Sequence, residues 1–254
     1  MKYNFVFDKD FLGNKTFFLS DMERFVVLAA VVGGHNVALS GYHTERLVSA
    51  IKYLRDKNTP FVSVESNIEH YELIGKFSDS GLKQGFVTAA DGGMLHFSNL
   101  DSQEVGIISW LQIVMTNGWI KLSNNGNVRT LPAKFQLIAE NYDDSSTGKY
   151  CDINFRCNEG NQRCLWTLAE LKRQICIAKS YQQFRCAADV KNRDICHTND
   201  LKLSSDAKTM FSEQSIKIGT LRLARTIADI YGHRLIFCSD IETAKDFQNI
   251  SGGY

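Results

Sequence analysis

The sequence contains no apolar run that could cross a membrane, because its longest clean run, 25–32, has eight residues and a bilayer needs about 20. The opening stretch MKYNFVFDKD also lacks the apolar segment of a signal peptide, so we expect a cytoplasmic protein without membrane contact. No charge of one sign dominates, since 29 Lys and Arg balance 28 Asp and Glu, and nucleic-acid binding would need a local patch. Seven cysteines, an odd number without a secretory signal, favour free thiols over a disulfide framework.

What the 254 residues do contain is an alternation of short apolar segments and helical patterns. Strands are predicted at 3–7, 36–40, 61–64, 93–97 and 135–139. Helices are predicted after a capping box at 20–23, from about residue 44, and over 102–115. This alternation predicts a mostly parallel sheet flanked by helices, and Asn125-Gly126 between two apolar segments predicts an inserted β-hairpin.

The pattern changes at about residue 141. The polar stretch 141–161 is predicted to be a loop, and the apolar positions beyond it recur at helical spacing. A second capping box is predicted at 239–242. We therefore predict an α/β domain over residues 1–150 and a loop plus a helical domain over residues 151–254.

The loop after strand 36–40 occupies the place of a phosphate-binding loop, but its sequence does not match one. A Walker A motif has the form G-x-x-x-x-G-K-[ST]. Counting from Gly41, its glycine, lysine and hydroxyl residue are replaced by Arg46, Leu47 and Val48. The stretch 42–45 contains no glycine that could curl around a phosphate, and its last residue is an acid that would repel one.

Four stretches nevertheless resemble the magnesium chelatase-like AAA+ ATPases, including the competence-associated branch. They are AAVVGGHNVALSG at 29–41, DGGMLHFSNL at 91–100, LPAKFQLIAEN at 131–141 and LRLARTIADI at 221–230, in family order. The resemblance spans nearly the whole chain and implies a P-loop NTPase (AAA+)-like α/β fold with a C-terminal helical lid. It also implies a vestigial nucleotide site at Gly41, Tyr42, His43, Thr44, Glu45, Arg46, Ser98, Asn99, Asn141, Arg222 and Arg225.

The departures from the family concern its catalytic elements. The loop after Gly41 is about three residues shorter than in the family and has no lysine, and Ser98-Asn99 replaces the Asp-Glu that holds magnesium and activates water. Asn141 matches the sensor asparagine, and Arg222 and Arg225, on one helix face, match the sensor arginines of the lid. The arginine-finger segment is largely absent. We therefore expect the strand after it to be missing too, which leaves a sheet edge near which residues 3–7 would pair.

These losses predict a catalytically inactive homologue that acts as a scaffold or regulatory protein. We expect this homologue to bind another protein, and an active AAA+ relative is one such partner. The alternative is a divergent protein that still binds ATP or ADP with little or no hydrolysis, with Arg46, Arg222 or Arg225 replacing the missing cation. Neither interpretation requires a catalytic residue or magnesium. We expect a monomer or dimer, because the resemblance implies rings that depend on nucleotide at subunit interfaces.

A third option is a nucleic-acid-binding module. It rests on a basic cluster with interleaved aromatics, comprising Lys172, Arg173, Lys179, Arg185, Lys191, Arg193, Tyr181 and Phe184. A solvated helix face, diluted by Asp189 and Asp194, is the simpler interpretation of the same residues.

The remaining cysteines and histidines are expected to be structural. Cys151, Cys157 and Cys164 could hold zinc with Cys196-His197, but their separations of six and seven residues do not match zinc spacings. Buried or half-buried thiols are predicted at Cys176, Cys186 and Cys238. Among the histidines, His35 and His96 are predicted to be hydrogen-bonded structural residues and His43 to be exposed.

Overall fold

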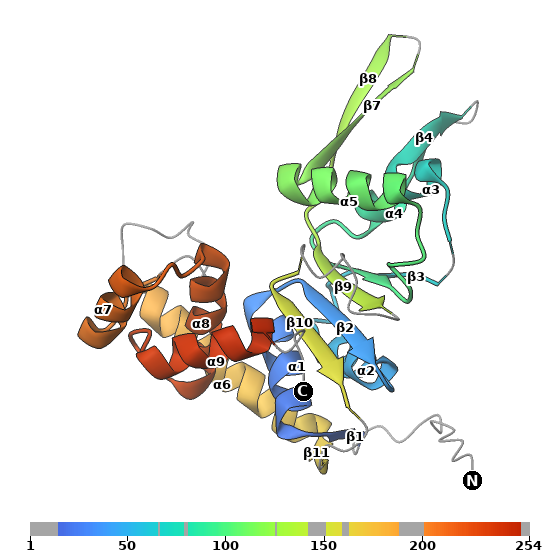
Figure 1. Ribbon diagram of the computed structural model, residues 1–254. Coiled ribbons are helices and arrows are strands. Elements are labelled where there is room, and N and C mark those ends of the chain that lie inside the picture. Colours follow the sequence, from blue (N-terminus) through green and yellow to red (C-terminus); the bar gives the residue numbers. More distant parts are fainter. Residues whose placement is uncertain are drawn as a thin grey trace.

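The computed structural model describes residues 15–65, 67–78, 81–124, 126–141, 151–158, 163–187 and 201–249. Four of its strands lie where the sequence predicts them: β2 (Val37–Gly41), β3 (Phe61–Val64), β6 (Met94–Phe97) and β9 (Gln136–Asn141). They form a parallel sheet with a fifth strand, β10 (Ile153–Cys157), in the order β10-β2-β9-β6-β3 (Figure 1). The predicted parallel α/β fold is therefore confirmed.

Strand β10 corrects two predictions. The stretch 141–161 is not all loop, and the sheet does not lack a strand beside β2. Buried Ile153, Phe155 and Cys157 alternate with more exposed neighbours, a two-residue period in a segment too short to stand out in the sequence. Residues 3–7, predicted to pair near this edge, lie outside the described residues. Although β10 lies beyond residue 150, it belongs to the sheet, and the division into 1–150 and 151–254 stays a prediction.

Helix α1 (Asp21–Gly33) begins at the predicted capping box. The Ser20 hydroxyl accepts the N–H of Glu23 at 3.2 Å, and the Glu23 carboxylate accepts the N–H of Ser20 at 2.8 Å. The helix ends at Gly34, whose φ of +65° is a left-handed conformation that suits glycine. Its whole apolar run is buried between the sheet and helices α2 (Glu45–Leu54), α6 (Leu168–Ala187) and α8 (Ile218–Tyr231), which explains why the run shows no polar face.

A second apolar core supports two β-hairpins that project from the sheet (Figure 1). The predicted hairpin consists of β7 (Trp119–Asn124) and β8 (Asn127–Pro132), and the other of β4 (Gly75–Ser78) and β5 (Gly81–Gln84). We call these four strands the hairpin arm. Helices α3 (His70–Ile74), α4 (Phe86–Ala89) and α5 (Val105–Asn117) pack at its base. The sequence analysis assigned no element to residues 65–92, because four-residue strands with polar ends carry little periodic signal.

The C-terminal region is helical, as predicted. A short antiparallel pair, β1 (Thr16–Leu19) with β11 (Cys164–Thr167), leads into α6. Helices α7 (Ser205–Glu213), α8 and α9 (Cys238–Asn249) follow. The capping box predicted at 239–242 is wrong, since α9 begins at Cys238 and the Asp240 carboxylate accepts the N–H of Phe237 at 2.8 Å. Among the described residues, no helix is both long and apolar enough to cross a membrane.

Candidate functional site

The loop after β2 lies at the carboxyl end of the parallel sheet. Gly41 has a φ of +87°, and a Cβ at this position would lie 2.4 Å from the carbonyl oxygen of Cys157, so only glycine fits. The same carbonyl accepts the N–H of Tyr42 at 3.1 Å. His43 is exposed as predicted and takes a φ of +61°, with its Nδ1 3.1 Å from a carboxylate oxygen of Glu45. The left-handed turn that a glycine-rich loop makes easily is therefore made here by a histidine, at a conformational cost.

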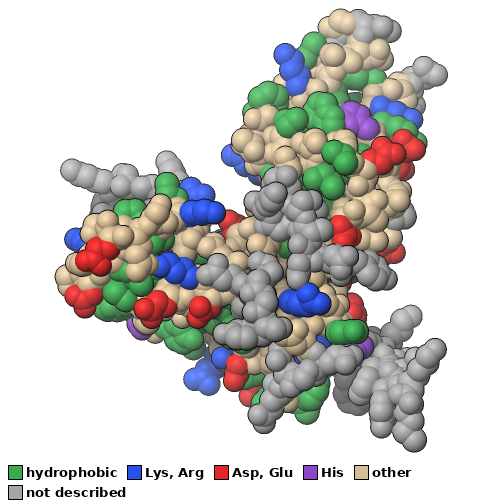
Figure 2. All heavy atoms as spheres, viewed as in Figure 1, with side chains coloured by type: hydrophobic (Ala, Val, Ile, Leu, Met, Phe, Trp, Pro, Cys, Tyr) green, Lys and Arg blue, Asp and Glu red, His purple; other side chains and the backbone are tan. Residues whose placement is uncertain are grey.

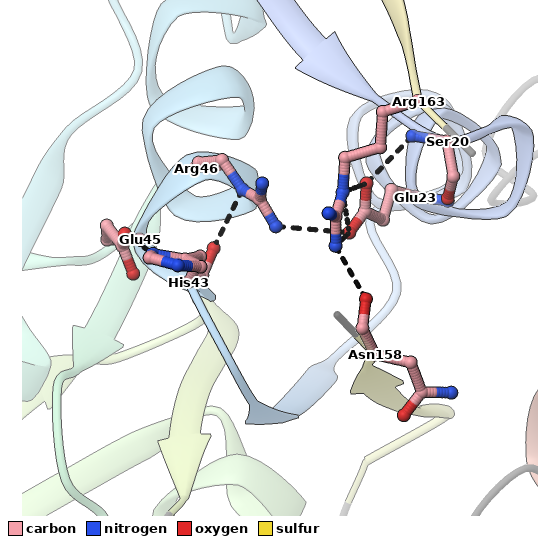
Figure 3. Close-up of polar contacts among 7 residues, drawn as sticks. All are labelled: Ser20, Glu23, His43, Glu45, Arg46, Asn158 and Arg163. Carbon is pink, nitrogen blue, oxygen red and sulfur yellow. Dashed lines mark hydrogen bonds and ion pairs between the residues drawn. The ribbon is translucent and has the colours of Figure 1, made fainter. Parts of the chain in front are cut away.

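Two guanidinium groups converge on one buried carboxylate beside this loop (Figure 3). Glu23 has an exposed side-chain fraction of 0%, and its carboxylate lies 3.4 Å from Arg46 Nη2 and 3.2 Å from Arg163 Nε. Arg46 Nε also donates to the carbonyl oxygen of His43 at 3.2 Å, and Arg163 Nη2 to that of Asn158 at 2.6 Å. The cation nearest the loop is thus directed at an acid of the same chain, where a phosphate-binding loop would direct its lysine at the ligand.

A second polar cluster crosses three neighbouring strands at the same end of the sheet. The Thr44 hydroxyl donates a hydrogen bond to the carboxylate of Glu140. His96 Nε2 lies 2.8 Å from the other carboxylate oxygen of Glu140, and His96 Nδ1 lies 3.3 Å from Ser63 Oγ. Thr44 and His96 are buried, and the Glu140 side chain is nearly so. The prediction that His96 is a satisfied structural histidine is confirmed.

After β6, where the resemblance expects the Asp-Glu pair that holds magnesium, the chain has Ser98 and Asn99. Magnesium in nucleotide sites binds carboxylate, hydroxyl and phosphate oxygens. The Ser98 hydroxyl donates to the carbonyl oxygen of Val64 at 3.2 Å, and Asn99 offers an amide in place of an acid. Asn141 ends β9, next to Glu140, whose carboxylate is already engaged. Within the described part of the chain, no group of three His, Cys, Asp or Glu side chains is placed to hold a metal ion.

Arg225 lies far from this end of the sheet, inside the helical region. Its side chain has an exposed fraction of 0% and pairs with Asp229 at 3.0 Å. It also donates to the carbonyl oxygens of His233 and Arg234, which join α8 to α9. Asp229 in turn binds Arg185 of α6 at 3.2 Å. Arg225 therefore joins α8 to the segment before α9, and Asp229 links α8 to α6; the structure does not bring Arg225 to the loop after β2.

Arg222 lies at the amino end of the sheet. Both arginines belong to α8 and are three positions apart, but Arg222 is exposed and Arg225 is buried, so the two side chains have different environments. Burial alone would raise the pKa of Asp152, but the hydrogen bond and charge of His35, the N–H of Asn36 and the charge of Arg222 together hold that pKa below its ordinary value. His35 is buried and lies 2.8 Å from Thr226 Oγ1 of α8, which confirms its predicted structural role.

This amino-end cluster explains the G-G-H-N stretch at 33–36. Asn36 accepts the N–H of Leu137 at 2.8 Å, and its own N–H donates to Asp152 at 3.0 Å. Because Asn36 and Asp152 precede β2 and β10, the stretch joins neighbouring strands where they begin. The motif therefore supports the fold, at the end of the sheet opposite the start of α2.

The basic cluster predicted at 172–193 is only partly on the surface. Lys172 and Arg173 are exposed and Lys179 is half-buried, but Arg185 is buried against Asp229. Phe184 is exposed and Tyr181 half-buried. The other two cations, Lys191 and Arg193, and the Cys196-His197 pair lie outside the described residues.

The cysteines divide into protected and accessible thiols. Burial, with smaller effects of nearby charges led by Glu23, raises the pKa of Cys157 to about 12, and burial followed by the charge of Asp152 raises the pKa of Cys151. The prediction that Cys176 is buried or half-buried is wrong, because it is exposed, as is Cys164. Cys238 is half-buried as predicted, and the Cys186 side chain lies outside the described residues.

This division predicts an order of alkylation. With iodoacetamide at about pH 8 we expect Cys164 and Cys176 to react first, because the reactive thiolate forms where the thiol is accessible to water. Cys157 is buried and should stay unmodified until the protein unfolds, and half-buried Cys151 should react more slowly than the two exposed thiols. Peptide mass spectrometry over time, with a urea-unfolded control, measures the order. Modification of Cys157 as fast as Cys176 in the folded protein would contradict the structure.

The strand order and the loop at the carboxyl end of β2 define a P-loop NTPase-like α/β fold. The family described as magnesium chelatase, subunit ChlI, matches residues 46–176, just over half of the chain. The protein belongs to this magnesium chelatase family, which confirms the resemblance. A comparison with curated proteins finds no match.

The sequence analysis missed three of the residues that organise the site. Glu23 and Arg163 are 140 positions apart, and Glu140 lies between a predicted strand and the sensor position. The only sequence signal for Glu23 was the capping box, which accounts for one of its contacts and not for its two guanidinium partners. A single sequence gives no signal that would pair these positions.

Proposed function

We propose that this protein does not hydrolyse ATP and acts as a scaffold or regulatory member of its family, bound to another protein such as an active AAA+ relative. One observation carries the proposal. Arg46, the cation nearest the loop after β2, is paired with Glu23, a buried carboxylate that a second arginine also contacts. Phosphoryl transfer depends on cations that are directed at the phosphates, and here the cation is directed at an internal carboxylate.

The groups that would activate water support the same proposal. Ser98 and Asn99 follow β6, and neither side chain can act as a general base at neutral pH. Glu140 is the acid closest to them in the sheet, and it is bound by Thr44 and faces His96. A carboxylate engaged in this way is not free to orient an attacking water.

The surface of α5 supports a role in protein binding. The helix contains no charged residue, and three of its apolar side chains are exposed on the outside: Val105, Trp110 and Ile113. Figure 2 shows hydrophobic side chains gathered at the position of α5, at the base of the hairpin arm. Grouped apolar side chains on a surface are typical of protein–protein contacts.

A second candidate is nucleotide binding without hydrolysis. Arg46 and Arg163 converge at the carboxyl end of β2, so a nucleotide phosphate that displaced Glu23 would meet two guanidinium groups. Neither Arg222 nor Arg225 contributes to this candidate, because one lies at the opposite end of the sheet and the other is bound within the helical region.

Isothermal titration of the full chain with ATP and with ADP, each with and without magnesium, tests both candidates. We expect no heat, no shift of the melting temperature and no release of phosphate at millimolar nucleotide. A magnesium-independent Kd in the micromolar range, about −8 kcal/mol, would support the second candidate instead. In that case Arg163→Gln should abolish the binding, while the exposed control Arg173→Gln should not. Phosphate release that rises with protein concentration would refute both.

A further inference from the structure

The described strand residues of the hairpin arm carry charge of one sign. They contain four exposed cations, Lys76, Lys83, Lys121 and Arg129, and no Asp or Glu. None of the four is within ion-pair distance of an acid among the residues that the structure describes. In Figure 2, Lys and Arg side chains lie on both flanks of the upper part of the arm. The arm is thus a local basic patch on a chain that is almost neutral as a whole.

Two of these cations lie directly opposite each other. Lys76 of β4 pairs in register with Lys83 of β5, so both side chains leave the same face of the hairpin. Like charges in this position destabilise a hairpin. The Lys76 ammonium lies 3.9 Å from the ring centroid of Tyr71, which holds it in place without neutralising it. A bound polyanion would remove the repulsion.

An exposed aromatic side chain accompanies the cation on the other hairpin. Trp119 and Lys121 of β7 are two residues apart and so lie on one face, where they pair with Pro132 and Thr130. Trp119 has an exposed fraction of 45%. The intervening Ile120 is buried in the second core, which fixes the orientation of the strand. A flat aromatic surface next to a cation is the arrangement on which single-stranded nucleic acids stack their bases and bind their phosphates.

We propose that the hairpin arm binds single-stranded nucleic acid, with Trp119 stacking on a base and Lys76, Lys83, Lys121 and Arg129 attracting phosphates. The cations alone would suit any polyanion, and the exposed Trp119 next to Lys121 favours a chain of bases over an acidic peptide. The surface differs from the basic stretch of α6 and from the loop after β2. The proposal goes beyond the scaffold function and does not depend on it.

Fluorescence anisotropy with a labelled oligothymidylate of about 16 nucleotides tests the proposal on the full chain. We expect saturable binding at about 50 mM salt that weakens steeply by about 200 mM. Trp119→Ala should weaken binding about 5-fold or more, whereas Trp119→Phe should largely retain it. Lys121→Gln should lower the slope of log K against log salt by about one, and Lys121→Arg should restore it.

Lys172→Gln is the matched control, since it removes an exposed cation from α6 and should leave affinity and slope unchanged. All these side chains are exposed, and melting curves verify that the variants fold. Absence of binding at about 50 mM salt would overturn the proposal. So would an affinity that falls in Lys172→Gln but is unchanged in Trp119→Ala. Equally tight binding of polyglutamate would assign the arm to an acidic protein instead. None of these outcomes bears on the nucleotide titration.

Discussion

Glu23→Gln is expected to lower the free energy of unfolding by about 3 kcal/mol. The substitution removes the one carboxylate that lies between Arg46 and Arg163, and both arginine side chains are largely buried. A buried guanidinium without its acid keeps the cost of desolvation and loses the attraction that offsets it. The glutamine also weakens the capping box of α1, because its neutral oxygen is a poorer acceptor for the N–H of Ser20. Urea unfolding followed by circular dichroism measures the change.

Asp21→Asn is the matched control for this experiment. Asp21 lies on the same first turn of α1 and pairs with Arg24 at 3.7 Å, but its side chain is 83% exposed. Exposed ion pairs contribute little, so we expect a loss below about 1 kcal/mol. Equal losses for the two variants would show that Glu23 acts only through the helix terminus. If Glu23→Gln left the stability unchanged, the two arginines would not depend on Glu23. The main support for the proposed loss of hydrolysis would then be removed.

The inner strands of the sheet could be predicted because most of their residues are apolar. Residues 37–40 of β2, 94–97 of β6 and 136–139 of β9 are all buried, since both faces of these strands are covered. Strand β10 lies at the edge and mixes Asn154 and Arg156 with its buried residues, which made it resemble the polar segment around it. The same reason applies to β4 and β5, where lysines alternate with glycine and single apolar residues.

Only the location of the candidate site could be predicted from the sequence. The position of the loop after β2 follows from the order of strand and helix, and Gly41 marked it in the sequence. The contacts of Arg46 could not be predicted, because its partner Glu23 lies on a different helix and a third residue, Arg163, comes from beyond β10. Local spacing describes neighbours within one element, whereas this cluster forms through packing between elements.

Substitution of Arg222 and Arg225, the two arginines that match the lid sensors, distinguishes a structural role from a nucleotide-binding role. Arg225→Met should lower the free energy of unfolding by about 3 kcal/mol, because it removes a fully buried ion pair with Asp229 and leaves two carbonyl groups without their donor. Arg222→Met, three residues earlier on the same helix, should change it by less than about 0.5 kcal/mol, because that side chain is exposed. Chemical unfolding of both variants tests the contrast.

A nucleotide sensor would give the opposite pattern. Arginines that contact a bound phosphate are held in place by the ligand. Their substitution would therefore leave the stability of the free protein unchanged and lower its affinity for nucleotide. The methionine at position 225 keeps most of the buried volume, so its effect reports the lost polar contacts and not a cavity. Asp229 retains Arg185 in the Arg225→Met variant. A second substitution, Arg185→Met, should then cost more in that background than in the parent chain, because Asp229 would lose its remaining charged partner.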